Sequence, residues 1–248
     1  LEDFYGTGHT SSNNISFSGG GEKGTFRLGI TDMRNKGIIP NSSMRRNNIS
    51  LGLTQYATKN LVISANVDYI TEEVKNRYIF KGAQGNSAGT LLWVNSNMPT
   101  SALAPGYGAD YKEKVLGTDL NATNPYYTLN RISNQTEKDR FISTVNVRWN
   151  ILDGLFVQAK AGQDFYTFNT HKIVPEGTGY RPNGQIDQTG MNFWERNFEG
   201  LIGLDKKLNE NFGLAVNLGG NLMSQHRTTT TIVGSGFVLP QFHVINNT

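Results

Sequence analysis

Three carboxylates that lie close together in the sequence are the first residues to consider for chemistry. Asp68, Glu72 and Glu73 could supply the acid and base of a glycoside hydrolase, which needs two carboxyl groups flanking one bond. Adjacent residues of a β-strand point to opposite faces, however, so Glu72 and Glu73 would not converge. The four histidines also lack the spacing of metal ligands. The sequence therefore predicts no catalytic constellation, no metal site, no cofactor and no enzyme activity.

A second group of residues could bind a ligand through aromatic rings. Aromatic faces with polar tips suit sugar rings and peptide side chains. Segment 78–137 is rich in Gly, Asn and Pro, and connections of this length are usually functional or disordered. The alternative is that its aromatic residues pack the loop itself or contact a partner protein. The candidate substrate-binding residues are Trp93, Tyr107, Tyr111, Tyr126 and Tyr127.

Two segments that contain glycine mark tight turns. Gly19–Thr25 lacks the G-x-x-x-x-G-K-[ST] spacing of a phosphate-binding loop, and it leads into a strand instead of a helix. Asp153-Gly154 is an ordinary hairpin signal between two apolar segments. Both segments are therefore expected to join neighbouring β-strands.

Alternating apolar and polar residues mark the elements that would position these side chains. In Phe212–Met223, one face carries mainly Leu, Val and Phe, and the other carries mainly Gly, Ala and Asn. The same period of two recurs in eight segments, which pair into four hairpins. The expected strands are residues 10–20, 25–35, 44–56, 61–77, 138–149, 155–172, 191–205 and 212–232.

The connections between these strands alternate between short and long. The short ones are Gly20–Gly24, Ala57–Asn60, Ile151–Gly154 and Lys206–Asn211, and the long ones are Asn35–Ser43, Tyr78–Glu137, Ile173–Gly190 and the tail from Val233. In a transmembrane β-barrel, short turns lie on one side of the membrane and long loops on the other. Apolar alternation also begins at the short turns and fades toward the long loops. This pattern is typical of strands that leave an apolar layer at one end.

These features favour an all-β, antiparallel transmembrane β-barrel segment over a soluble β-sandwich. A sandwich also alternates, but its solvent face would carry more Lys and Glu than the Asn, Ser, Thr, Gly and Gln found here. Phe141 and Trp149 are eight residues apart, about 26 Å of strand, which spans roughly 20 Å when tilted by ~40°. That span is close to the ~25 Å apolar band of such barrels.

Composition sets further limits on the function. The 248 residues carry a net charge of +3 without a cluster of Lys and Arg, so no nucleic-acid partner is expected. The absence of cysteine excludes disulfide scaffolds and thiolate metal sites. Mean hydropathy is −0.43, and no stretch approaches the ~20 apolar residues of a membrane helix. The chain begins without Met or a signal peptide, so we expect a processed N-terminus or a fragment of a longer protein.

A series of segments along the chain is familiar when taken in order. They are Ser18–Leu28, Lys36–Ser42 followed by Arg45–Asn47, Asn124–Tyr127, Asp139–Phe141, Ala161–Tyr166, Leu218–Asn221 and the tail Leu239–Asn247. This series resembles the barrel of the SusC/RagA-like TonB-dependent outer-membrane transporters of Bacteroidetes. The resemblance implies a 22-stranded barrel with a plugged lumen, in which residues 1–248 would form about eight strands, numbers two to nine. The plug, the TonB-contacting segment and the closing strands would be absent from this chain.

The resemblance also implies a function and a set of partners. It implies active import of a large nutrient, a glycan or an oligopeptide, across the bacterial outer membrane. Expected partners are a SusD-like surface lipoprotein, TonB through segments outside this chain, the remainder of the same barrel and its plug, outer-membrane lipid, and the glycan or peptide substrate. Two alternatives stay open, a soluble secreted β-sandwich that binds carbohydrate and a passive porin-like barrel. In a barrel, the charged residues of the polar face would contact the plug or water: Arg148, Lys160, Asp164, Glu195 and Glu199.

Overall fold

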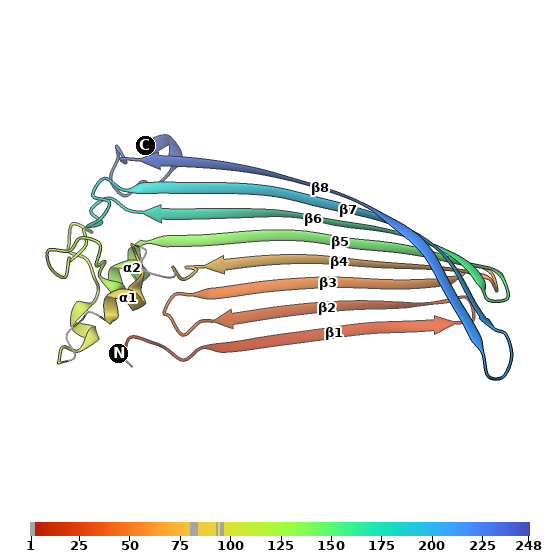
Figure 1. Ribbon diagram of the computed structural model, residues 1–248. Helices are drawn as coiled ribbons and strands as arrows, with labels where there is room; N and C mark the ends of the chain where they lie inside the picture. The colour runs from red at the N-terminus through yellow and green to blue at the C-terminus, as the bar shows by residue number, and fades with distance from the viewer. Residues whose placement is uncertain (1–2, 80–83, 93, 95–96) are drawn as a thin grey trace.

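Eight antiparallel strands form one sheet in which each strand pairs with its neighbours in the sequence (Figure 1). The computed structural model describes residues 3–79, 84–92, 94 and 97–248. The strands are β1 (His9–Gly21), β2 (Gly24–Lys36), β3 (Ser43–Tyr56), β4 (Leu61–Lys75), β5 (Ser133–Leu152), β6 (Leu155–Val174), β7 (Gln185–Lys207) and β8 (Gly213–Ser235). Within the described residues there is no second sheet facing this one, so the expected barrel segment is confirmed over the alternative of a β-sandwich.

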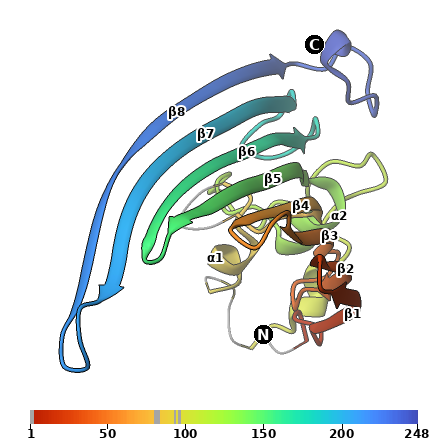
Figure 2. The same cartoon turned by 90° about the vertical axis from the view of Figure 1, so that its right-hand side faces the viewer.

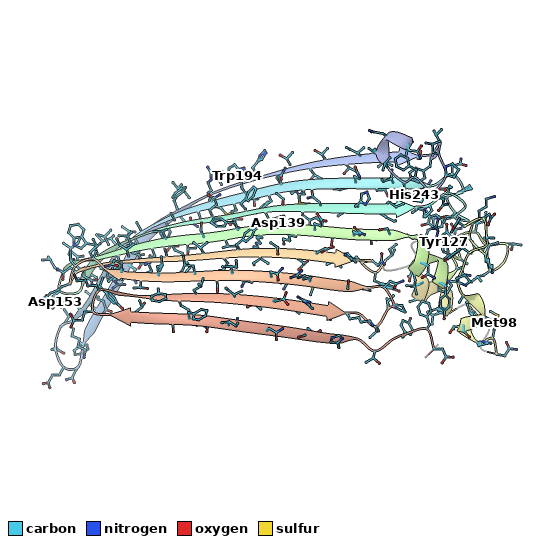
Figure 3. The ribbon with its side chains drawn as sticks, turned by 180° about the vertical axis from the view of Figure 1, so that it is seen from behind. Met98, Tyr127, Asp139, Asp153, Trp194 and His243 are labelled. Carbon is cyan, nitrogen blue, oxygen red and sulfur yellow. The ribbon has the colours of Figure 1, made fainter. Side chains whose placement is uncertain are left out.

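The sheet is curved like part of a barrel wall (Figure 2), and all the long connections gather at one end of it (Figure 1). That end also carries the helical elements α1 (Ser87–Leu91), η1 (Thr100–Leu103), α2 (Pro125–Arg131) and η2 (Ile245–Asn247). Among the described residues, no helix is both long and apolar enough to cross a membrane. The short turns lie at the other end, where Figure 3 marks Asp153. The alternation of short and long connections expected from the sequence is therefore present.

The two faces of the sheet follow from the pairing register. The apolar face is defined by the row in which Ile15, Ile30, Ile49, Tyr69, Phe141, Phe165, Trp194 and His226 lie opposite one another across the eight strands. We call this row the upper row. Residues at even steps from it share its face, and residues at odd steps lie on the polar face. Many apolar side chains of the first face are exposed in this sheet, which is the arrangement of a barrel wall that faces lipid.

The tilt of the strands can be derived from the positions of the short turns. From the upper row, β1 continues for six residues to Gly21, β3 for seven to Tyr56, β5 for eleven to Leu152 and β7 for thirteen to Lys207. The turns thus descend by about 1.2 residues for each strand. At ~3.3 Å per residue and ~4.8 Å between strands, this slope corresponds to a tilt of about 40°. Barrels that span the outer membrane have tilts of roughly 35–45°.

The strands lengthen steadily along the chain. The first two have 13 residues each, β5 and β6 have 20, and β7 and β8 have 23. The added length lies partly at the end that carries the long loops. Pairing there begins earlier than expected from hydrophobicity, at Ser133 in β5 and at Gln185 in β7. Polar residues occupy both faces of these extensions, so the apolar period of two disappears while the backbone ladder continues.

Segment 78–137, which the sequence presents as one loop, contains three short helical elements. One of them, α2, had a readable signal. Asn124 accepts hydrogen bonds from the backbone N–H groups of Tyr126 and Tyr127, and Pro125 occupies the first turn. An Asn cap followed by Pro is a common helix start because it satisfies free N–H groups and presets the backbone angle. The cap anchors two of the candidate aromatic residues.

Candidate functional site

The long connections pack against one another to form a single loop layer. This layer comprises residues 3–8, 37–42, 76–79, 84–92, 97–132, 175–184 and 236–248, at the end of the sheet opposite the short turns. Figure 3 shows Met98, Tyr127 and His243 together at this end. The candidate site is built on this layer, because four of the five aromatic residues singled out from the sequence lie in it.

Two small apolar clusters hold the loop layer together. In the first, Phe4, Leu91 and Leu129 are buried, and Ile39 and Tyr126 pack against them. This cluster joins the segment before β1 to the β2–β3 loop and to both α-helices. A second cluster lies beside it, formed by Tyr127, Ile132 and Val174. Segments distant in sequence therefore share buried apolar surface, which stabilises one arrangement of the loops.

Glu113 joins the β4–β5 connection to the β6–β7 loop. Its Oε1 accepts a hydrogen bond from the backbone N–H of Asn124 at 2.6 Å, and its Oε2 accepts one from Gly179 N–H at 2.8 Å. Its own N–H donates to Gly177 O at 3.0 Å. Burial raises the pKa of the Glu113 carboxyl, although these hydrogen bonds oppose the rise. Glu113 thus acts as a clamp between two loops.

Glu176 forms a second clamp, to the segment that follows β8. Its Oε1 accepts hydrogen bonds from the backbone and side-chain N–H groups of Gln241 at 2.7 and 2.9 Å, and its Oε2 lies 2.8 Å from His243 Nε2. Burial favours a higher pKa for Glu176, but the hydrogen bonds outweigh it and the pKa falls below its ordinary value. The side chain of Gln241 also accepts a hydrogen bond from Arg131. The contacts therefore continue from Glu176 to α2.

Two tyrosines and an arginine form an aromatic ledge on the loop layer. The rings of Tyr107 and Tyr111 stack with their centroids 6.1 Å apart. The Arg131 guanidinium lies 4.9 Å from the Tyr111 ring centroid and 5.7 Å from that of Tyr107. Tyr111 is 48% exposed and has φ of 63°, a backbone conformation that a bulky residue adopts only when its surroundings impose it. The ledge thus presents a fixed aromatic face with a cation behind it.

The structure divides the five aromatic residues predicted as substrate contacts into different environments. Tyr107 and Tyr111 come together in the aromatic ledge. Tyr126 is half-buried and packs edge-on against Phe4, with ring centroids 5.3 Å apart. Tyr127 has no exposed surface, and its hydroxyl is 2.9 Å from Thr178 Oγ1, so it occupies the loop core. Trp93 lies outside the described residues.

A second group, which was not predicted as a group, lies on the polar face close to the upper row. The rings of Tyr166 and Phe193 stack with centroids 4.8 Å apart, and Lys138 Nζ lies 4.7 Å from the Tyr166 ring centroid. Beside them, Arg140 binds Asp164 through two hydrogen bonds of 2.9 and 2.6 Å. We call these five residues the wall group. The register brings them together from β5, β6 and β7, and sequence spacing alone does not specify that register.

The remaining residues considered for chemistry are separated by the sheet. Glu72 pairs with Arg46 on the polar face, while Glu73 pairs with Lys75 at 3.2 Å on the apolar face. Their carboxylates therefore do not converge on one bond. In the polar-face register, Lys160 lies opposite Glu199 and Asp164 opposite Glu195. No cluster of three potential metal ligands occurs among the residues for which coordinates are described.

Comparison with known proteins places this geometry among transporter barrels. No family model matches the sequence, and no curated protein matches it. Among solved structures, the RagAB peptide transporter aligns with a TM-score of 0.77 at 17% identity, over 99% of this chain and 28% of that one. Another structure of the same importer, in an open-open state, gives 0.75 at 16% identity over 98% of this chain and 27% of that one.

A ferric preacinetobactin receptor, BauA of Acinetobacter baumannii, aligns less closely. Its TM-score is 0.50 at 12% identity, over 97% of this chain and 36% of that one. The fold is an all-β, antiparallel β-barrel segment that matches part of these structures. The chain spans a little over a quarter of the length of the RagAB chains that it matches. At these identities the likeness concerns the fold.

Proposed function

We propose that this chain is the barrel segment of an outer-membrane transporter that imports a large nutrient, a glycan or an oligopeptide, in a TonB-dependent manner. In this proposal, residues 1–248 are about strands two to nine of a 22-stranded SusC-like barrel. The short turns face the periplasm and the loop layer faces the exterior. The plug and the TonB-contacting segment belong to other parts of the transporter. The chain contributes wall and loops and carries out no enzymatic reaction.

The aromatic ledge is the observation that carries the proposal. Tyr107, Tyr111 and Arg131 form a fixed, partly exposed surface at the loop end of a barrel whose fold is shared with a peptide transporter. Aromatic faces stack on sugar rings and on apolar peptide side chains, and a guanidinium binds carboxylates. Substrate captured there would next meet the wall group on the lumen side. In this proposal, a SusD-like surface lipoprotein would cover the loop layer.

Substrate uptake by the intact transporter tests this proposal. Tyr111→Ala, which removes the exposed ring, is expected to weaken substrate capture by about tenfold, because stacking contributes roughly 1–1.5 kcal/mol. Tyr56→Ala is the matched control, because this exposed tyrosine lies beside a short turn at the opposite end of the sheet. Equal uptake by both variants would contradict a role for the ledge. Uptake that continues without the membrane energy supply would instead support a passive porin-like barrel.

A further inference from the structure

One arginine lies on the face of the sheet that otherwise carries no charge within the membrane band. On β4–β8, the apolar face below the upper row consists of apolar, small or uncharged polar residues, with Arg196 of β7 as its one charged member down to Leu204. An Arg at the centre of a lipid-facing barrel surface costs ~2–4 kcal/mol, and the cost falls to ~0–1 kcal/mol near the interfaces. The position of Arg196 along the membrane normal is therefore decisive.

The tilt of the strands gives that position. From Leu204, the last apolar residue before the short turn on this face, to Trp194 is ten residues. At ~3.3 Å per residue and a tilt of ~40°, this distance is about 25 Å along the membrane normal, equal to the apolar band. Trp194 thus marks the outer boundary, and Arg196 lies about 5 Å below it. The Arg196 guanidinium lies 4.8 Å from the Trp194 ring centroid, so the side chain extends toward the headgroups.

The surroundings of Arg196 are polar across four strands. Its neighbours in the row are Gln163 of β6 and Ser224 of β8, and Ser143 of β5 lies next to Gln163. The same row in β1–β4 is entirely apolar, consisting of Phe17, Leu28, Leu51 and Val67. The polar stripe is therefore confined to β5–β8, beside the single cation.

Arg196 also lacks an internal counter-ion. Within the part of the chain that the structure describes, it forms no salt bridge, and its contact is with the Trp194 ring. Arg34 and Arg45, on the same face but nearer the loops, both pair with Asp32, at 2.9 and 3.4 Å. These two cations share one carboxylate of the protein, whereas no carboxylate of the described residues pairs with Arg196. The anion that would neutralise Arg196 must therefore come from outside the sheet.

We propose that Arg196, Trp194, Gln163 and Ser224 form a docking site for the phosphate headgroup of a lipid in the outer leaflet. Arginine binds phosphate through parallel N–H···O bonds, and the amide and hydroxyl groups of the neighbouring strands can donate to the remaining oxygens. Trp194 holds the guanidinium at the level of the headgroups, where tryptophan is favoured in membranes. Acyl chains of the same lipid would cover Phe198 and Leu222 in the next row toward the short turns.

Binding of a phosphorylated lipid to the intact transporter tests this site. The transporter is held in micelles of an uncharged maltoside detergent, which contains no phosphate, and lipid A with or without its phosphates is titrated into them. Arg196→Gln is expected to weaken binding of phosphorylated lipid A by about tenfold, the loss of one charge-assisted interaction. Arg34→Gln is the matched control on the same face and should bind like the wild type, because Arg34 is already paired with Asp32.

The unmodified protein provides a second measurement that does not depend on folding of a variant. Wild-type transporter should bind dephosphorylated lipid A as weakly as Arg196→Gln binds the phosphorylated form. Three results would overturn the proposal: equal binding of both lipids by the wild type, full binding by Arg196→Gln, or an equal loss in Arg34→Gln. Competition by millimolar inorganic phosphate that abolishes binding would overturn the assignment to a lipid, since a free anion would then occupy the site. Binding of a second barrel at this face in place of lipid would overturn it as well.

Discussion

The two halves of the sheet carry apolar bands of different height. On β2, the residues of the apolar face are apolar from Phe26 to Ile30, and the next residue on that face is Asp32. At a tilt of ~40°, this apolar stretch extends about 10 Å along the membrane normal. On β7, the corresponding face extends from Leu204 to Trp194, about 25 Å. At β2 the wall therefore matches a thin apolar layer, and at β7 a layer of ordinary thickness.

The difference shows that the length of a strand does not determine the height of the apolar band on its lipid-facing side. The strands of the first half have 13–15 residues, enough to cross a bilayer, but the residues of their outer thirds are mostly polar. A bilayer next to them must become thinner, or polar groups of lipid must approach more deeply, at a cost of fractions of a kcal/mol per Å. The second half spans the full band and still projects beyond it, and there it carries most of the loop layer.

A charge placed on the apolar face should show the largest difference between the two halves, measured as the loss of barrel stability. Phe198→Arg introduces a cation near the middle of the band on β7 and is expected to destabilise the barrel by ~2–4 kcal/mol. Ile30→Arg, at the top of the thin band and next to Asp32, is expected to cost ~0–1 kcal/mol. Reversible unfolding of the intact transporter from lipid vesicles measures both values. Equal costs would mean that the two halves face the same apolar thickness.

Removal of the clamp at Glu113 should loosen the loops above the second half. Glu113→Ala leaves the partly buried N–H groups of Asn124 and Gly179 without their acceptor, at a cost near the lower end of ~1–3 kcal/mol each. Hydrogen exchange of residues 124–132 and 175–184 should accelerate, while exchange in β1–β3 should be unchanged. Faster exchange throughout the sheet would show instead that the clamp supports the whole barrel.

Loss of the Tyr127 hydroxyl should have a smaller effect at the same place. Tyr127→Phe removes its hydrogen bond with Thr178 Oγ1 but keeps the buried ring, so the loop layer should lose about 1 kcal/mol. Hydrogen exchange near residue 178 measures this change, and Tyr107→Phe in the aromatic ledge is the control. An effect as large as that of Glu113→Ala would contradict the ranking of the two contacts.

Acidification should loosen the segment after β8, and this is the smallest of the expected changes in stability. The pKa of Glu176 is lower in the folded protein than its ordinary value of 4.5, so its ionised form is favoured by folding. Its stabilising contribution is complete above 4.5 and is lost as the pH falls through the lower folded value. Exchange of residues 236–248 should therefore rise below pH 4.5 in the wild type, whereas Glu176→Gln should show no such pH dependence. Persistence of the same rise in Glu176→Gln would assign it to another group.

Much of the barrel could be predicted from the sequence, because the alternation of apolar residues and the two lengths of connection both report on the membrane. Residues such as Phe212–Met223 and the turn at Asp153 carry that signal directly. The polar ends of β5 and β7 could not be predicted, since backbone hydrogen bonds hold them without apolar alternation. The wall group and the polar stripe at Arg196 depend on a register across three or four strands, which one sequence does not specify. Tyr111 could be predicted as a candidate, but its strained backbone could not.

The joint between Glu113 and the β6–β7 loop has a consequence for the evolution of the loop layer. On the β6–β7 side, the joint uses main-chain atoms, the N–H of Gly179 and the carbonyl of Gly177. Two positions are constrained: at Gly177 a Cβ would lie 2.5 Å from Lys112 Cγ and φ is +79°, and at Gly179 a Cβ would lie 3.2 Å from Glu113 Oε2. Elsewhere in this loop, side chains can change without removing those two contacts. Such a joint tolerates divergence, so the surface of the loop can change in sequence while the path of its backbone is conserved. It offers one physical route to the same barrel segment at 17% identity.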